Sequence, residues 1–309
     1  FNINQLEHFP NSSVAICCHD KGAAVHIASW FKKFSNKLRI FAKGPSKLLF
    51  NNFNDSLFFD DLNECISDAK ILISGTGWQT DIEFNSRLIA KNKNIPSVAV
   101  IDHWTNYEGR FIFKGKKLYP DHILVSDKYA KKIAEETFSN ICVTELSNIW
   151  LNDVVDYYKN NLSSKKNLLR PKKLLYLTEP YRQKWSNSKL IPEYQALKYF
   201  SEAIDKLSEN KLIAKKNQIE SIHIKTHPTE NDSKYSKYLE SLNLPGKIFI
   251  NKYESLEDSL LNADVAFGCE TQALIVAHAC GLNVISTLPP WAPKCKLPHK
   301  FIIHISKLS

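Results

Sequence analysis

Short apolar, strand-like runs alternate with segments of helical period along almost the whole of this 309-residue chain. Such alternation is the signature of βαβ units, because parallel strands need a crossover helix between them. In the first half, the predicted strands are 13–18, 38–42, 71–74, 97–101, 122–125 and 141–143, and the predicted helices are 23–34, 82–91 and 128–137. In the second half, the predicted strands are 174–178, 221–225, 247–250, 265–268 and 283–286, and the predicted helices are 192–207, 234–242, 256–262 and 271–280. The sequence therefore predicts an α/β chain built on parallel sheets.

A polar and basic segment at 160–173 has no apolar period and separates the two series. We therefore predict an N-terminal Rossmann-like lobe at 1–160 and a C-terminal Rossmann-like lobe at 161–309. In open sheets of this kind, ligands bind beyond the carboxyl ends of the strands. In a two-lobed chain we expect that site in the cleft between the lobes.

The composition limits the class of protein. The longest apolar runs are far shorter than the roughly 18 residues of a membrane helix, and the seven cysteines include no CxxC pair. We expect a reduced, cytoplasmic protein without a structural zinc. The net charge of +9 suits an anionic substrate and contact with an anionic inner membrane face. The basic residues are spread over linkers and helix faces, which argues against nucleic-acid recognition.

The segment 263–287 carries the strongest chemical signal. A predicted strand ends at Gly268, a tight turn follows, and a helix opens at Thr271 and closes at Gly281. A helix start presents backbone N–H groups and a positive dipole end, which together bind phosphate. An acidic Glu270 is awkward beside a phosphate, so we expect it to accept hydrogen bonds from a ribose or sugar hydroxyl. The alternative is an ordinary βαβ crossover whose Thr271 is only a cap. The predicted donor contacts of this turn are Gly268, Cys269, Glu270, Thr271 and Gln272.

The segment 222–230 places Lys225, His227 and Pro228 just after a predicted strand. Pro228 restricts His227 to an extended backbone, which aims the imidazole from the strand end toward the ligand. A histidine there can donate to or protonate a leaving phosphate, because its pKa is near neutrality. The alternative is a structural histidine in a turn.

Further donor contacts are predicted around these two motifs. Thr178 and Glu179 stand at the end of the predicted strand 174–178. Lys294 and Lys296 lie in a stiff, proline-rich loop after the last predicted strand, from which they could reach phosphate or carboxylate groups. Solvent-facing lysines are the alternative for this loop.

The N-terminal half offers acidic and glycine-rich strand ends. Asp81 and Glu83 fall in the first turn of the predicted helix 82–91, where the dipole alone also favours them. Asp102 and His103 follow the predicted strand 97–101, as a catalytic or acceptor site would need. The predicted acceptor contacts are Lys21, Gly22, Gly75, Thr76, Gly77, Trp78 and His103. The turn Asp20-Lys21-Gly22 is a further potential anion or hydroxyl site, but it is not a GxGxxG loop, so dinucleotide binding is not expected.

Taken together, these residues resemble a GT-B glycosyltransferase. KTHPTE and the following Glu270-Thr271 resemble the two C-terminal motifs of bacterial sialyltransferases. Over nearly its whole length the chain resembles transferases of nonulosonic acid and capsule or lipopolysaccharide gene clusters, in the stretches AKGPSKLLF, ISGTGWQTDIE, IPSVAVIDHWTNYEGRF, LYPDHILVSDKYA, LLYLTEP, KTHPTE, FGCETQALIVAHACG and STLPPWAPKCKLPH. The resemblance implies that His227 assists departure of CMP and that Thr271 holds its phosphate. It leaves the general base open among Asp81, Glu83 and Asp102, since the acidic-acidic-Gly tripeptide of those enzymes is missing.

The expected function is transfer of a sialic-acid-like (nonulosonic) or 3-deoxy-manno-octulosonic acid residue from its CMP donor to a bacterial surface glycan. A CMP-linked sugar carries one phosphate, so we expect no essential metal and no cofactor besides the co-substrate. The alternatives are a UDP-sugar-dependent glycosyltransferase or a UDP-sugar epimerase on the same fold, and a basic, non-enzymatic adaptor.

Overall fold

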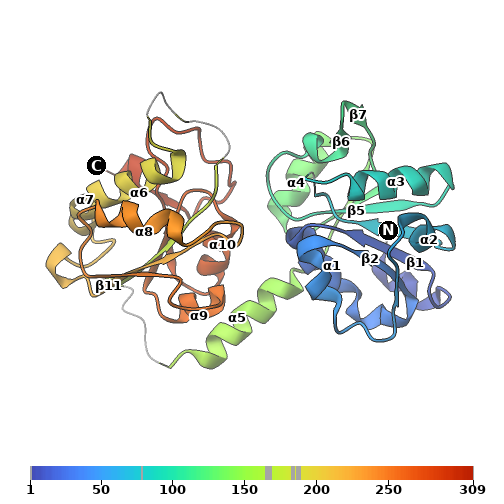
Figure 1. Ribbon diagram of the computed structural model, residues 1–309, viewed down its shortest axis with the longest axis horizontal. Helices are drawn as coiled ribbons and strands as arrows, with labels where there is room; N and C mark the ends of the chain where they lie inside the picture. The colour runs from blue at the N-terminus through green and yellow to red at the C-terminus, as the bar shows by residue number, and fades with distance from the viewer. Residues whose placement is uncertain (1, 78, 164–168, 182–184, 186–188, 309) are drawn as a thin grey trace. The chain divides into compact units, whose positions relative to one another are not determined.

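The computed structural model describes the chain except for residues 1, 78, 164–168, 182–184, 186–188 and 309. The chain forms two compact units, Phe1–Trp150 and Leu151–Ser309, each a parallel sheet with helices packed on it (Figure 1). This division falls at the start of helix α5 (Ile149–Asn161), ten residues before the boundary at 160 drawn from the sequence. The difference arises because residues 149–161 form a regular helix, whose Tyr157 donates a hydrogen bond to Asp258 of the second unit at 3.1 Å.

The N-terminal unit contains a seven-stranded sheet in which all neighbouring strands run parallel. Its strands, in spatial order, are β3 (Leu57–Phe58), β2 (Leu38–Ala42), β1 (Val14–Cys18), β4 (Ile71–Ser74), β5 (Ser97–Ile101), β8 (His122–Val125) and β9 (Cys142–Glu145). The strand order reverses between β1 and β4, so this unit has its topological switch point there. A two-stranded antiparallel hairpin, β6 (Ile112–Phe113) and β7 (Lys116–Lys117), lies outside the sheet.

Helices cover both faces of this sheet. Helix α1 (Lys21–Phe31) contributes Ile27 and Phe31 to a core on one face. Helices α2 (Leu62–Ser67) and α3 (Ile82–Asn92) pack on the other face, around Leu72 and Ala90. Helix α4 (Lys128–Thr137) packs against β8 and β9. The unit is therefore doubly wound, as the alternation of strands and helices predicted.

The C-terminal unit repeats this architecture with six parallel strands. In spatial order they are β12 (Lys247–Ile250), β11 (Ser221–Lys225), β10 (Lys173–Leu177), β13 (Val265–Gly268), β14 (Asn283–Ser286) and β15 (Ile303–His304). Its helices are α6 (Pro192–Glu202), α7 (Ile204–Glu209), α8 (Ser233–Glu240), α9 (Leu256–Leu261) and α10 (Gln272–Ala279). The switch point falls between β10 and β13, where the order reverses again. The prediction of an α/β, GT-B-like chain of two Rossmann-like lobes is confirmed.

Two predicted helices are divided in the structure. The predicted helix 23–34 ends at Phe31 and continues as a 3-10 segment, Lys32–Lys37, in which Phe34 leaves the helical region. The predicted helix 192–207 is divided at Ala203 into α6 and α7. Among the described residues, no helix combines the length and the apolar character that crossing a membrane requires.

Candidate functional site

Three carboxylates gather at the carboxyl edge of the N-terminal sheet, beside its switch point. Asp20 follows β1 and caps α1, where its side chain accepts a hydrogen bond from Ala23 N at 3.2 Å. Glu83 reaches back from α3, and its Oε1 accepts from His19 N at 2.8 Å. Asp102 follows β5 directly. Thus two residues of the predicted catalytic set, Glu83 and Asp102, are brought together with Asp20.

Two glycines leave the space that these carboxylates occupy. A Cβ on Gly77 would lie 2.6 Å from Asp20 Oδ2 and 3.0 Å from Glu83 Oε1. A Cβ on Gly22 would lie only 1.9 Å from Asp102 Oδ2. These two predicted acceptor residues therefore act by making room for the acids, which is a role that a missing side chain can fill.

The three acids differ in their electrostatic environment. Burial together with the charges of Asp102 and Glu83 raises the pKa of Asp20 to about 7. Burial likewise raises the pKa of Glu83, which is fully buried. Burial alone would raise the pKa of Asp102, but the guanidinium of Arg110, 2.9 Å away, together with His103 and His26, outweighs it and lowers that pKa. The pKa of Asp20 is therefore near neutrality, while that of Asp102 is held below its usual range.

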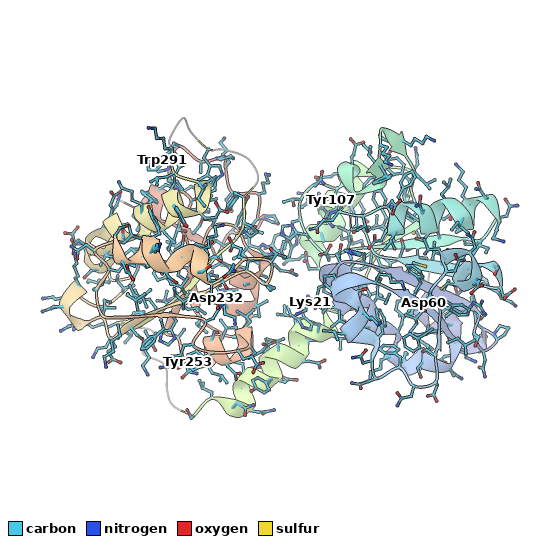
Figure 2. All side chains as sticks on the ribbon, in the orientation of Figure 1. Lys21, Asp60, Tyr107, Asp232, Tyr253 and Trp291 are labelled. Carbon is cyan, nitrogen blue, oxygen red and sulfur yellow. The ribbon has the colours of Figure 1, made fainter. Side chains whose placement is uncertain are left out.

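The other predicted residues of this unit are placed differently. Asp81 is exposed at the start of α3 and makes no side-chain cap bond. Thr76 is fully buried, donates to Val100 O at 2.8 Å and ties β4 to β5. Lys21 is exposed at the first position of α1 (Figure 2). His103 is half-buried, with Nδ1 3.0 Å from Thr105 Oγ1. The predicted contact Trp78 is outside the described residues.

In the C-terminal unit, Thr178 joins the ends of β10 and β11. Its Oγ1 accepts from His227 N at 2.9 Å and donates to Glu230 Oε2 at 2.6 Å. The buried carboxylate of Glu230 accepts two more hydrogen bonds. Its Oε1 accepts from Tyr235 OH at 2.7 Å and from Lys234 Nζ at 2.5 Å. The THPTE segment is thus fixed by a carboxylate that the sequence analysis did not select.

The hydrogen bonds of His227 define its tautomer. Its Nδ1 accepts from Thr229 N at 3.2 Å and lies 2.8 Å from Thr229 Oγ1. Because Nδ1 is an acceptor, the ring proton of the neutral form is on Nε2. Burial lowers the pKa of His227, so the neutral form prevails near pH 7. His227 is thereby a hydrogen-bond donor through Nε2.

Two glutamates meet at the turn before α10. The Glu179 carboxylate accepts from Glu270 N at 3.2 Å and from Tyr181 OH at 3.1 Å. Burial and the charge of Glu270 raise the pKa of Glu179 to about 7. Thr271 caps α10, as predicted, by accepting from Ala273 N at 3.3 Å. A carboxylate therefore already uses one of the backbone N–H groups of the expected phosphate turn.

The remaining predicted donor contacts have structural partners or are exposed. Lys225 Nζ donates to the carbonyls of Tyr253 at 2.9 Å and Glu254 at 2.7 Å. A Cβ on Gly268 would meet Leu177 O at 3.0 Å, so this glycine allows close strand packing. Cys269 is buried with Sγ 3.6 Å from Thr287 Oγ1, and Gln272 is half-buried as the first residue of α10.

Lys294, Lys296 and Pro228 are exposed, and the backbone N–H of Lys296 donates to Glu270 Oε2 at 2.8 Å. Trp291, from the same proline-rich loop, donates to Gln195 Oε1 at 2.8 Å (Figure 2). The loop is thus fixed to the α10 turn and to α6.

Sequence reasoning did not identify Arg110 as a site residue. It lies on a short 3-10 segment, Glu108–Phe111, and is buried. Its Nη1 donates to Asp102 Oδ1 at 2.9 Å and to Thr76 Oγ1 at 3.2 Å. The one available signal was its spacing from Asp102, which is too weak to predict an ion pair.

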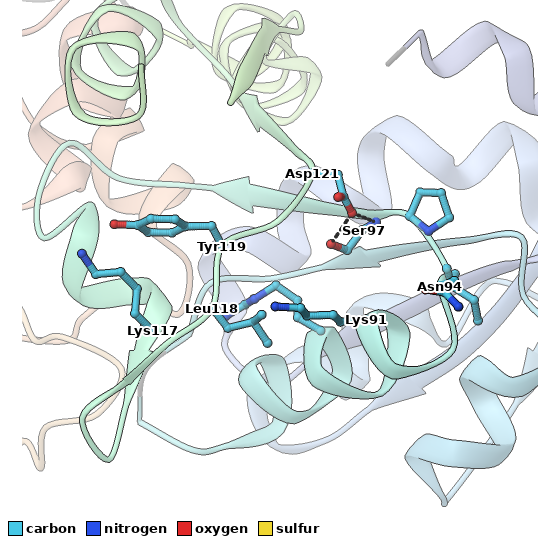
Figure 3. A pocket seen from close by; sticks show the side chains of 10 residues that line it. Lys91, Asn94, Ser97, Lys117, Leu118, Tyr119 and Asp121 are labelled. Atoms are coloured by element: carbon cyan, nitrogen blue, oxygen red, sulfur yellow. Dashed lines mark hydrogen bonds between the residues drawn. The ribbon is translucent and has the colours of Figure 1, made fainter. Parts of the chain in front are cut away.

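A pocket of about 790 Å³ lies elsewhere in the N-terminal unit (Figure 3). Ser97, the first residue of β5, and Asp121, which precedes β8, place it at the amino edge of the sheet, away from the carboxylates. Asp121 Oδ2 accepts from Ser97 N at 2.7 Å and Oγ at 3.0 Å. The residues that line this pocket include none of the predicted site residues.

The sequence matches no protein-family model, and no curated protein matches it. Several solved structures match the fold of this chain at low sequence identity. MnaA of S. aureus, in a co-structure with UDP, is 12% identical, with 89% of this chain and 79% of that chain covered and a TM-score of 0.57. The UDP-GlcNAc 2-epimerase of Methanocaldococcus jannaschii, in complex with UDP-GlcNAc and UDP, is 12% identical, with 89% and 83% covered and a TM-score of 0.53. At this identity the comparison establishes a shared fold.

Proposed function

We propose that this chain is an enzyme that acts on a nucleotide-activated sugar, and that its reaction is glycosyl transfer. The observation that supports this most is in the C-terminal unit. There Thr178 holds His227, and the adjacent Glu179 holds the turn before α10, so both motifs meet at the switch point between β10 and β13. Switch points are where open α/β sheets bind nucleotides.

The C-terminal residues suit the donor half of such a reaction. His227 Nε2 can donate to the oxygens of the departing phosphate and stabilise the charge that develops there. Glu179 and Glu270 can accept hydrogen bonds from ribose hydroxyls. The positive end of α10 lies behind the same turn.

The N-terminal carboxylates suit the acceptor half, in which a base takes a proton from the attacking hydroxyl. A glycan would be the acceptor, and the net charge of +9 supports both an anionic donor and contact with an anionic membrane face.

Two donor classes have separate support. The resemblance of KTHPTE and FGCETQ to sialyltransferase motifs supports a CMP-linked nonulosonic or 3-deoxy-manno-octulosonic acid. Local charge agrees, since Glu179 and Glu270 favour a donor with one phosphate over a diphosphate. The likeness to UDP-bound structures supports a UDP-sugar instead, and hence the second candidate function, UDP-sugar epimerisation. The structural comparisons favour this UDP alternative over the CMP donor.

Product analysis separates these functions. The chain is incubated with CMP-N-acetylneuraminic acid or with UDP-GlcNAc, with and without a bacterial surface oligosaccharide, and products are followed by NMR. Acceptor-dependent release of CMP or UDP with a new glycosidic linkage supports transfer and identifies the donor class. Isomerised UDP-sugar without an acceptor supports the epimerase. Neither product, together with no nucleotide binding, would return the chain to the adaptor class.

A further inference from the structure

We propose that Asp20 is the proton acceptor of the N-terminal unit, in place of the three acids that the sequence analysis offered. This inference rests on the proposed function, because it names the group that activates the acceptor hydroxyl.

Two of the three sequence candidates are held in ways that weaken them as bases. Asp102 is ion-paired with Arg110 at 2.9 Å, and this pairing stabilises its anionic form. A carboxylate stabilised in that way binds a proton weakly. Glu83 is fully buried, and its Oε1 takes the N–H of His19. A substrate hydroxyl cannot reach it without displacing the loop after β1.

The third sequence candidate, Asp81, lies at the surface. It is exposed before α3 and makes no cap bond through its side chain. Asp20 instead lies at the switch point between β1 and β4, where the chain after β1 continues to one side of the sheet and the chain after β4 to the other. It is half-buried, so a ligand can reach it.

The two oxygens of Asp20 have different surroundings. Oδ1 accepts from Ala23 N at 3.2 Å, which fixes the carboxylate on the start of α1. Oδ2 faces Gly77, and a Cβ there would lie 2.6 Å from it. The missing side chain therefore gives Oδ2 room beside Gly77, and access for a hydroxyl rests on the residue being only half-buried.

The charged neighbours of Asp20 tune it toward neutral pH. Glu83 faces it from α3, Asp102 from the end of β5 and Arg110 from the 3-10 segment 108–111. Burial and the two acids raise the pKa of Asp20 to about 7, against the opposing effects of the Ala23 N–H and Arg110. A base is most effective when its pKa lies near the working pH.

The proton and electron balance of the step is simple. The acceptor O–H bond breaks, and its proton moves to Asp20 Oδ2. The freed oxygen lone pair forms the bond to the anomeric carbon of the donor sugar. The bond from that carbon to the phosphate oxygen breaks, and its electron pair leaves with the nucleotide. Asp20 then returns the proton to water.

The test compares Asp20→Asn with Asp61→Asn in the full chain. Both aspartates cap a helix, because Asp61 accepts from Glu64 N at 2.9 Å at the start of α2, and asparagine caps equally well. Asp61 is exposed, so its variant controls for loss of a capping carboxylate. Asp20→Ser, which retains a capping oxygen, is a second variant should the asparagine disturb folding.

Turnover is measured with CMP-N-acetylneuraminic acid and UDP-GlcNAc, and nucleotide affinity by calorimetry. We expect the wild-type kcat at saturating donor to rise with pH and level off above about 7, since the ionised acid is the active form. Asp20→Asn should lower kcat by about 10²-fold to 10⁴-fold and leave the nucleotide affinity unchanged. Its remaining activity should lack the rise with pH, here called the pH limb. Asp61→Asn should match the wild type.

An Asp20→Asn or Asp20→Ser variant that folds and keeps wild-type kcat with the same pH limb would overturn the role of Asp20 while leaving the proposed function intact. A wild type that binds neither nucleotide and turns over neither donor would overturn the proposed function itself. The two failures are therefore distinguishable.

Discussion

Gly22 and Asp102 share one space at the carboxyl edge of the N-terminal sheet. A Cβ on Gly22 would lie 1.9 Å from Oδ2 of Asp102 and 2.8 Å from its Cγ. The same carboxylate is held from the other side by Arg110 at 2.9 Å. Position 22 lies in a helix, where alanine would ordinarily be favoured over glycine. Here only glycine leaves room for the Asp102 carboxylate in its ion pair with Arg110.

Replacing this glycine tests that relationship. Alanine at position 22 would gain about 1 kcal/mol in helix propensity, but it must displace Asp102 from Arg110. We expect Gly22→Ala to lower the free energy of unfolding by about 2 kcal/mol, as measured by urea denaturation. In an Asp102→Ala background the overlap is gone, so the same change should be neutral or stabilising. Equal losses in both backgrounds would show that the overlap with Asp102 is not the cause.

The buried Glu230 should be needed for the shape of the donor half-site. Its side chain is 3% exposed and bonds Thr178, Lys234 and Tyr235. Glu230→Gln removes one of the two carboxylates paired with Lys234, which keeps Glu193 at 2.8 Å. We expect a loss of about 1–3 kcal/mol in unfolding free energy from the weakened buried hydrogen bonds, with weaker nucleotide binding. As the matched control, Glu202→Gln breaks an exposed pair with Lys198, which should cost below about 0.5 kcal/mol. Similar unfolding free energies of the two variants would contradict a stabilising role of the Glu230 carboxylate.

Nucleotide affinity should depend on pH through Glu179. Its pKa is raised to about 7, so a second negative charge develops beside Glu270 as the pH rises through neutrality. UDP-GlcNAc has no ionisation in that range, and its diphosphate should bind about threefold to tenfold more weakly near pH 8 than near pH 6. Glu179→Gln should remove this dependence. Calorimetry at the two pH values checks both, and a slope that survives in the variant would assign the effect to another group.

Periodicity predicted the sheets well because most strands are buried on both faces and carry continuous apolar runs. Strands β2, β4, β5, β8, β11, β12, β13 and β14 have the predicted bounds. The two-residue strands β3 and β15 were missed, since two residues carry no period. Helix α5 was missed altogether, although Leu151, Val154, Val155 and Tyr158 have helical spacing.

The candidate site could be predicted only in part. Strand ends identified Glu83 and Asp102, because carboxyl edges of parallel strands converge. The ion pair with Arg110 could not be predicted, since it depends on how the loop after β5 folds back. Lys225 shows the reverse case, because its place at the end of β11 suggested a phosphate ligand while its ammonium donates to two carbonyls. Side-chain direction, unlike strand position, is not encoded in the local pattern.

Calorimetric titration of CMP, CDP, UMP and UDP into the wild type and His227→Ala tests the nucleotide-sugar assignment most directly. We expect selective binding of one nucleotide class, weakened about tenfold or more by the substitution because a donor to the phosphate is lost. Selectivity for CMP would support a CMP-linked donor, and selectivity for UDP would support a UDP-sugar. Absence of binding by all four nucleotides to the folded wild type would contradict the assignment.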